Sequence, residues 1–134
     1  MEKLNLVKSA AESKDADAFG QALATVTERE SLVSIFNKVL LEDWHDAHED
    51  IVFELGLIGH PSSTESIEMA ATIPFQYLEE WGNLHEFQRK CAYALARIGT
   101  EESRNALKKL SESSDSYLQE YGQEGLRYWP LKKA

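Results

Sequence analysis

The chain has 134 residues, of which 43% are hydrophobic and 28% are charged, and this length and composition favour one globular domain over residues 1–134. Its single cysteine, Cys91, excludes an internal disulfide and a cysteine-rich zinc site. The net charge of −9, the absence of a long apolar run and the polar N-terminus favour a cytoplasmic protein that binds neither membranes nor nucleic acid.

Apolar residues recur at helical spacing through most of the chain, and no segment has the period-two pattern of a strand. We expect a short first helix in residues 1–14, followed by a polar turn. Further helices are expected over residues 18–26, 30–41, 44–58, 84–98, 101–111 and 116–129.

Capping signals mark several of the expected helix boundaries. Residues 59–61, Gly-His-Pro, end one helix, and residues 62–65, Ser-Ser-Thr-Glu, fit a capping box that begins the next one. Gly99 ends a later helix, and Thr100 is placed to cap residues 101–111. Asp15 and Asn83 are further N-cap candidates.

An internal repeat with an offset of 40 residues relates residues 51–67 to residues 91–107. The aligned pairs are Leu55 with Leu95, Ile58 with Ile98, Gly59 with Gly99, Ser63 with Ser103, and Ile67 with Leu107. A weaker copy with Ser31 in place of Ser63 begins 32 residues before the first unit. A period near 40 with two helices and a tight glycine turn is typical of HEAT or armadillo repeats. We therefore expect an all-α, small helical-hairpin solenoid that residues 112–129 close.

Short motifs between Trp44 and Trp129 also match a known family. They are residues 48–51 (His-Glu-Asp-Ile), 77–79 (Tyr-Leu-Glu), 90–95 (Lys-Cys-Ala-Tyr-Ala-Leu) and 98–100 (Ile-Gly-Thr), and the closing pattern Tyr121, Leu126, Trp129. This stretch resembles bacterial HEAT-like immunity proteins of the immunity protein 30 type, which are encoded beside polymorphic and contact-dependent toxins. The resemblance breaks at residues 82–83 and does not include residues 1–40. It implies a non-catalytic inhibitor that binds one cognate toxin in the cytosol and uses no cofactor.

Acidic residues are concentrated in the middle of the chain. Residues 1–38 have a net charge of −1 and residues 89–134 a net charge of +3, whereas residues 39–88 contain eleven acidic residues and no lysine or arginine. Such a segment repels nucleic-acid backbones and favours a basic partner protein, because opposite charges speed encounter. The expected partner is a basic toxin domain, interpreted as a nuclease.

The densest acidic segment is residues 42–50. On the expected helix, Asp43, Asp46 and Asp50 would share one exposed stripe, either as a solvated helix start or as a toxin-binding surface. The repulsion between these carboxylates would then be relieved when a cationic partner binds.

A second candidate segment, residues 75–81, lies between Pro74 and Gly82 and is expected to form a loop or a single helical turn. Phe75, Leu78 and Trp81 would cover the neighbouring helices and leave the intervening tyrosine and glutamates outward. The predicted toxin-binding residues of the two segments are Glu42, Asp43, Asp46, Glu49, Asp50, Tyr77, Glu79 and Glu80.

Other chemistry is less favoured by the sequence. His45 and His48 lack the partner motifs of di-iron and zinc-protease sites, so we expect no metal. The resemblance to the immunity proteins implies that His48 forms local hydrogen bonds that orient its helix. Cys91 is expected to be a small buried hydrophobe. Nucleotide-binding and hydrolase motifs are absent. Two alternatives stay open: a HEAT-like scaffold or adaptor for another basic protein, and, less favoured, a HEAT-like lyase.

Overall fold

In a computed structural model, which describes residues 2–131, all regular structure of this part of the chain is helical. The all-α class predicted from the sequence is therefore confirmed. The elements are α1 (Glu2–Ser13), α2 (Ala16–Leu23), the 3-10 helix η1 (Arg29–Leu32), α3 (Val33–Val39), α4 (His48–Ile58), the 3-10 helix η2 (Pro61–Ser63), α5 (Thr64–Ala71), α6 (Gln76–Glu80), α7 (Leu84–Ile98), α8 (Glu101–Ser111) and α9 (Ser116–Tyr128).

The predicted boundaries are most accurate in the C-terminal half. Helices α7 and α8 have the expected bounds, and α9 ends one residue early. The expected helix over residues 30–41 divides into η1 and α3, and the expected helix over residues 44–58 begins only at His48. Asp15 caps α2 as predicted, since its carboxylate accepts a hydrogen bond from the Ala18 amide at 3.1 Å. Asn83 precedes α7 but forms no side-chain capping hydrogen bond, because its side-chain amide donates to Glu49 instead.

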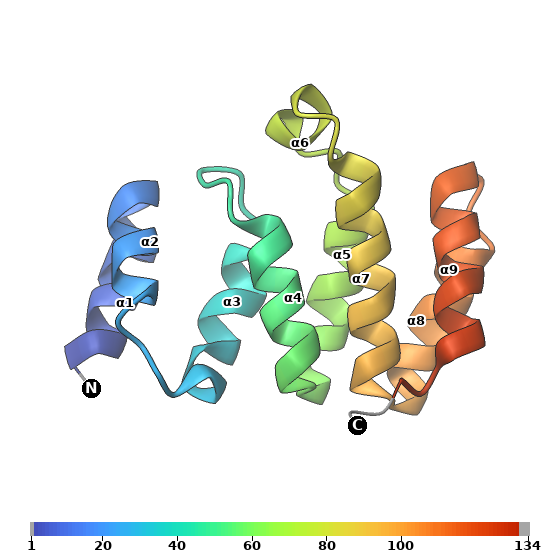
Figure 1. Ribbon diagram of the computed structural model, residues 1–134, viewed down its shortest axis with the longest axis horizontal. Helices are drawn as coiled ribbons and strands as arrows, with labels where there is room; N and C mark the ends of the chain where they lie inside the picture. Colours follow the sequence, from blue (N-terminus) through green and yellow to red (C-terminus); the bar gives the residue numbers. More distant parts are fainter. Residues whose placement is uncertain (1, 132–134) are drawn as a thin grey trace.

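The helices form two layers between which the chain alternates (Figure 1). Helices α2, α4, α7 and α9 lie in one layer, where α7 packs against both α4 and α9. Helices α1, α3, α5 and α8 lie in the other layer, where α5 packs against α3 and α8. The turns therefore collect at two ends of the molecule. One end contains Gly59 and Gly99, and the other contains the loop of residues 40–47 and α6.

The 40-residue repeat is visible in the backbone as well as in the sequence. Gly59 and Gly99 end α4 and α7 in the left-handed conformation, each with φ of 70°. This conformation is strained for residues that have a Cβ atom, which explains why both turns contain glycine. Ser63 and Ser103, the equivalent serines, are both fully buried.

The polar contacts of these two serines differ. Ser103 forms a reciprocal capping box with Thr100, with distances of 3.1 and 3.0 Å between side-chain oxygen and backbone nitrogen. Ser63 instead donates a hydrogen bond to the Asn37 side-chain oxygen at 2.7 Å. The capping box predicted in residues 62–65 is therefore wrong, because the His60 ring accepts from the Ser62 amide and begins η2 one turn earlier.

In the weaker third copy of the repeat, the equivalent serine has different surroundings. Ser31, which the alignment places beside the two buried serines, is exposed on η1. Its hydroxyl donates to the Glu28 carbonyl oxygen at 2.6 Å. The similarity of this copy is therefore limited to its apolar spacing.

A continuous apolar core lies between the two layers and extends from α1 to α9. Its largest fully buried side chains include Phe19, Phe36, Phe87, Leu55 and Leu95. At ~25 cal/mol per Å² of apolar surface, each buried phenylalanine or leucine contributes roughly 1.5–3 kcal/mol.

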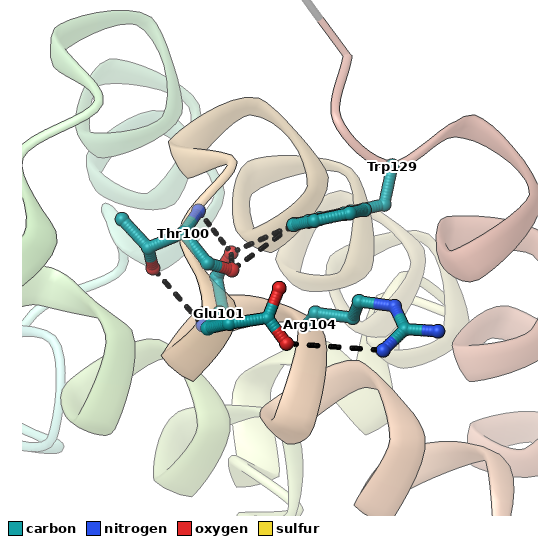
Figure 2. A network of polar contacts seen from close by, with 5 residues as sticks. Thr100, Glu101, Arg104 and Trp129 are labelled. Atoms are coloured by element: carbon teal, nitrogen blue, oxygen red, sulfur yellow. Dashed lines mark hydrogen bonds and ion pairs between the residues drawn. The ribbon is translucent and has the colours of Figure 1, made fainter.

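The last helix is attached to the turn between α7 and α8 by Trp129, as Figure 2 shows. Its indole nitrogen donates to the Thr100 carbonyl oxygen and to the Ser103 hydroxyl, both at 3.2 Å. The Arg104 guanidinium lies over the indole ring, 5.6 Å from its centre, and approaches Glu101 to 3.8 Å (Figure 2). These contacts close the C-terminal end of the described core.

Close packing of α9 on α8 gives a direct test of the fold. A Cβ atom at Gly122 would lie 2.8 Å from the Leu110 carbonyl carbon, which is backbone and cannot rotate away. We expect Gly122→Ala to lower the free energy of unfolding by about 2 kcal/mol, measured by urea denaturation. The matched control is Gly20→Ala on α2, where a Cβ would have no atom within 4 Å. This control is expected to gain up to ~1 kcal/mol from helix propensity. Unchanged stability of Gly122→Ala would contradict the close packing of α9 on α8.

Candidate functional site

The two acidic segments singled out in the sequence meet at one end of the molecule (Figure 1). Between them lies a cavity of about 750 Å³, here named the acidic cavity. The loop between α3 and α4 contributes Glu42, Asp43 and Trp44 to its wall, and the segment containing α6 contributes Tyr77 and Glu80. The cavity therefore combines aromatic rings with three carboxylates.

His48, the first residue of α4, joins these two segments. Its ring Nε2 donates to the Glu42 carbonyl oxygen at 2.6 Å, and its Nδ1 accepts from the Tyr77 hydroxyl at 2.7 Å. The same hydroxyl oxygen accepts from the His48 backbone amide at 3.2 Å. The local hydrogen bonding expected for His48 is therefore confirmed, and it includes a residue from α6.

The His45 ring likewise forms hydrogen bonds with both of its nitrogens, here to the backbone on either side of it. Its Nε2 donates to the Val39 carbonyl oxygen at 2.8 Å, and its Nδ1 accepts from the Ala47 amide at 3.0 Å. The His45 ring stacks on that of His48 with their centres 4.1 Å apart. Trp44 packs edge-on against His45 at 4.8 Å, and Phe75 packs against the other side of His48 at 3.9 Å. A buried aromatic column thus supports the wall of the acidic cavity.

Burial favours the neutral form of both histidines at pH 7. Burial lowers the pKa of His45, and it lowers the pKa of His48 to about 4, where the nearby His45 ring adds to the effect. Burial raises the pKa of Tyr77 to about 12, so its hydroxyl keeps its proton. Both nitrogens of both rings are engaged within the chain. In residues 2–131, no group of three or more His, Cys, Asp or Glu could hold a metal ion.

The histidines also explain why the predicted helix over residues 44–58 starts late. A ring nitrogen of His45 takes up the Ala47 amide, and this side-chain contact competes with a helical hydrogen bond. Asp43 and Asp46 consequently lie in a loop, while Asp50 lies on α4. The prediction that these three carboxylates form one helical stripe is wrong.

The eight predicted site residues divide among four environments. Glu42, Asp43, Tyr77 and Glu80 line the acidic cavity. Asp46 and Asp50 line a separate groove between α2 and α4. Glu79 is exposed on α6. Glu49 accepts hydrogen bonds from Lys90 at 2.9 Å and from Asn83 at 3.3 Å, so it joins α4 to α7.

Two aromatic residues of the α6 segment do not lie as expected. Tyr77, predicted to point outward, is half-buried because its hydroxyl bonds to His48. Trp81, predicted to cover the neighbouring helices, has 58% of its surface exposed. Phe75 and Leu78 are buried, as the spacing predicted.

Most carboxylates of residues 39–88 have no cationic neighbour within residues 2–131. Only Glu49 and Glu54 lie within 4 Å of a basic group among the residues that the structure describes, at Lys90 and Arg29 respectively. The other nine keep an uncompensated negative charge, and three of these line the acidic cavity. The cavity therefore has a negative field that attracts cations.

One residue of the cavity wall was not identified from the sequence. Lys14, in the turn between α1 and α2, lines the acidic cavity with a left-handed backbone, φ 55°. No motif marks it, since its position depends on how α1 and α2 pack beside the loop. Lys14 is the one basic residue in the lining of this cavity.

Cys91 is a free cysteine of the apolar core. Its side chain is fully buried on α7, and burial raises the pKa of the thiol, which disfavours the reactive thiolate. It therefore packs as a small hydrophobe, as expected.

None of the described helices is both long and apolar enough to cross a membrane. Compared with protein-family models, with curated proteins and with solved structures, the chain matches none of them.

The buried histidine predicts how stability depends on pH. The unfolded chain protonates His48 near pH 6.5, whereas the folded protein does so only near pH 4. Between these values the unfolded state binds more protons, so the free energy of unfolding decreases as the pH is lowered. We expect His48 to account for a loss of about 2 kcal/mol between pH 7.5 and pH 5.0, measured by urea denaturation.

A pair of variants isolates this contribution. His48→Gln should unfold at lower urea at pH 7.5 and lose less stability than the wild type on acidification. His85→Gln changes an exposed histidine and should retain the full wild-type pH dependence. An unchanged pH dependence in the His48 variant would show that protonation of this ring does not limit stability in acid.

Proposed function

We propose that the chain is a short HEAT-like solenoid. The units α4–α5 and α7–α8 support this assignment because they share the left-handed glycine turn and the buried serine at an offset of 40 residues. The alternation of the helices between two layers also fits an array in which each helix pair packs on the next.

We further propose that the protein is a cytoplasmic immunity protein, which neutralises a basic bacterial toxin domain, a nuclease in our interpretation, by stoichiometric occlusion. The observation that carries this proposal is the acidic cavity, whose wall combines uncompensated Glu42, Asp43 and Glu80 with aromatic rings. The resemblance of residues 44–129 to the immunity protein 30 type supports the same function. Occlusion requires no catalytic group and no cofactor.

The chemistry of the cavity suits arginine and lysine side chains of such a partner. Carboxylates form charge-assisted hydrogen bonds with guanidinium and ammonium groups, and the faces of Trp44 and Tyr77 attract cations. The negative field would accelerate encounter, while a few anchoring contacts would slow dissociation. Because the histidine column already fixes the loop, little conformational entropy would be lost on binding.

Co-expression with the polypeptide encoded immediately upstream tests this function. We expect this polypeptide to stop growth when expressed alone, and to form a stable complex with the present chain when both are expressed. The double variant Asp43→Lys, Glu80→Lys should bind it at least about tenfold more weakly and protect less, because two attractive charges become repulsive.

The matched control is Glu65→Lys, Glu68→Lys on α5, which changes the net charge equally in the other layer. Equal loss in both variants would refute the acidic cavity as the binding surface. A harmless polypeptide, or one that does not bind, would refute the immunity function and favour the adaptor alternative.

A further inference from the structure

A second surface lies beside the acidic cavity, in the layer that contains α2 and α4. These helices are neighbours in Figure 1, yet they enclose a groove of about 440 Å³ instead of packing closely. The buried Phe19, Phe36 and Ile51 form its floor, and the accessible apolar surface of its lining comes from the half-buried Leu23 and the exposed Ala16 and Ala24. Phe53 also lines it and is 54% exposed, which is unusual for a phenylalanine next to an apolar groove. Leu23 and Phe53 therefore present apolar surface at the groove that no described element covers.

The edges of this groove are charged. Asp46 and Asp50 line it and have no basic group within 4 Å among the described residues. Glu54 is adjacent and approaches Arg29 at 3.9 Å, the one cation in the lining. The net charge of these four side chains is negative, so the groove is complementary to a ligand that presents both apolar and basic side chains.

The sequence of α2 adds an independent observation. Ala16 and Gly20 of α2 and Ala24, the residue directly after it, recur at intervals of four residues, and all three line the groove. A glycine inside a helix lowers stability, and Gly20 has no internal packing reason, because a Cβ there would have no atom within 4 Å. A missing side chain at this position leaves the α2 backbone open to close approach by another molecule.

We propose that this groove, here named the α2–α4 groove, binds an amphipathic basic helix of the partner protein. Apolar side chains of that helix enter between Phe53 and α2, its backbone approaches Gly20, and its basic residues face Asp46 and Asp50. The inference rests on the proposed function, since it specifies which element of the basic partner is recognised.

A helix fits this surface better than a strand does. The groove runs between two helices, and ridges of side chains on a third helix pack into such a groove. Residues 2–131 contain no strand, so addition of a β-strand to a sheet edge has no template here. The volume accommodates several side chains but not a whole helix, which places the backbone of the ligand at the groove mouth.

The test uses a synthetic helix, so it does not depend on identifying the toxin. The probe is a labelled peptide of about 14 residues with leucines on one face and lysines on the other, comparable in length to α4. A shuffled peptide of the same composition has no apolar face. Fluorescence anisotropy should give a micromolar Kd for the amphipathic peptide and at least about tenfold weaker binding for the shuffled one.

Gly20→Leu fills the groove mouth and should weaken peptide binding at least about tenfold. Its matched control, Gln21→Leu, adds the same side chain next to it on an exposed position outside the groove and should leave binding unchanged. Phe53→Ala should also weaken binding, whereas Met69→Ala, on the similarly exposed Met69 of α5, should not. Circular dichroism of each variant checks that the fold is retained.

Three outcomes would overturn the inference. Equal binding of the shuffled peptide would show attraction by net charge alone. Loss of binding in Asp43→Lys, Glu80→Lys but not in Gly20→Leu would place the peptide in the acidic cavity. A concentration-dependent dimer that Gly20→Leu abolishes, detected by light scattering, would identify a second copy of the chain as the occupant. Each leaves the co-expression result unaffected, so this inference and the proposed function can fail separately.

Discussion

The acidic end of the molecule depends on two buried histidines that satisfy the polar backbone of a loop. Residues 40–47 form no helix, so their buried amides and carbonyls need other partners. His45 and His48 supply them at Val39, Glu42 and Ala47, and the Tyr77 hydroxyl fixes the proton on the far nitrogen of the His48 ring. One stacked pair of rings thereby determines where the loop runs, where α4 begins and how α6 is attached.

The neutrality of this pair has an electrostatic consequence. Protonated rings would compensate Glu42, Asp43 and Asp46, but burial keeps both histidines uncharged at neutral pH. The carboxylates therefore keep their full charge toward solvent, at a cost in mutual repulsion that the apolar core must offset. Such a surface is organised before a ligand arrives. The positions of its charges are fixed by the hydrogen-bonded histidines beneath the loop, in contrast to those of a flexible acidic tail.

The sequence predicted features that depend on local chemistry. The helical period identified α7 and α8 at their correct bounds, and the glycine turns at Gly59 and Gly99 were identified because few other residues adopt that backbone. The sequence-based prediction was wrong where side-chain contacts determine the backbone. Helical spacing suggested a helix through residues 44–47, yet the Ala47 amide that such a helix requires donates to the His45 ring instead. The acidic cavity was predicted only as two separate segments. Its assembly depends on a contact between residues 48 and 77, for which no local pattern exists.

The separation of α2 from α4 also affects how cooperatively the chain unfolds. Helices α1 and α2 pack mainly on each other, and α1 reaches the remainder through α3. Opening of this pair exposes less buried surface than unfolding of α4, α5, α7, α8 and α9, which contact one another in both layers. The amides of α1 and α2 thus belong to a smaller cooperative unit, whose hydrogen exchange proceeds by local opening while the C-terminal helices stay folded. A ligand seated between α2 and α4 would join the two units and merge their unfolding into one transition.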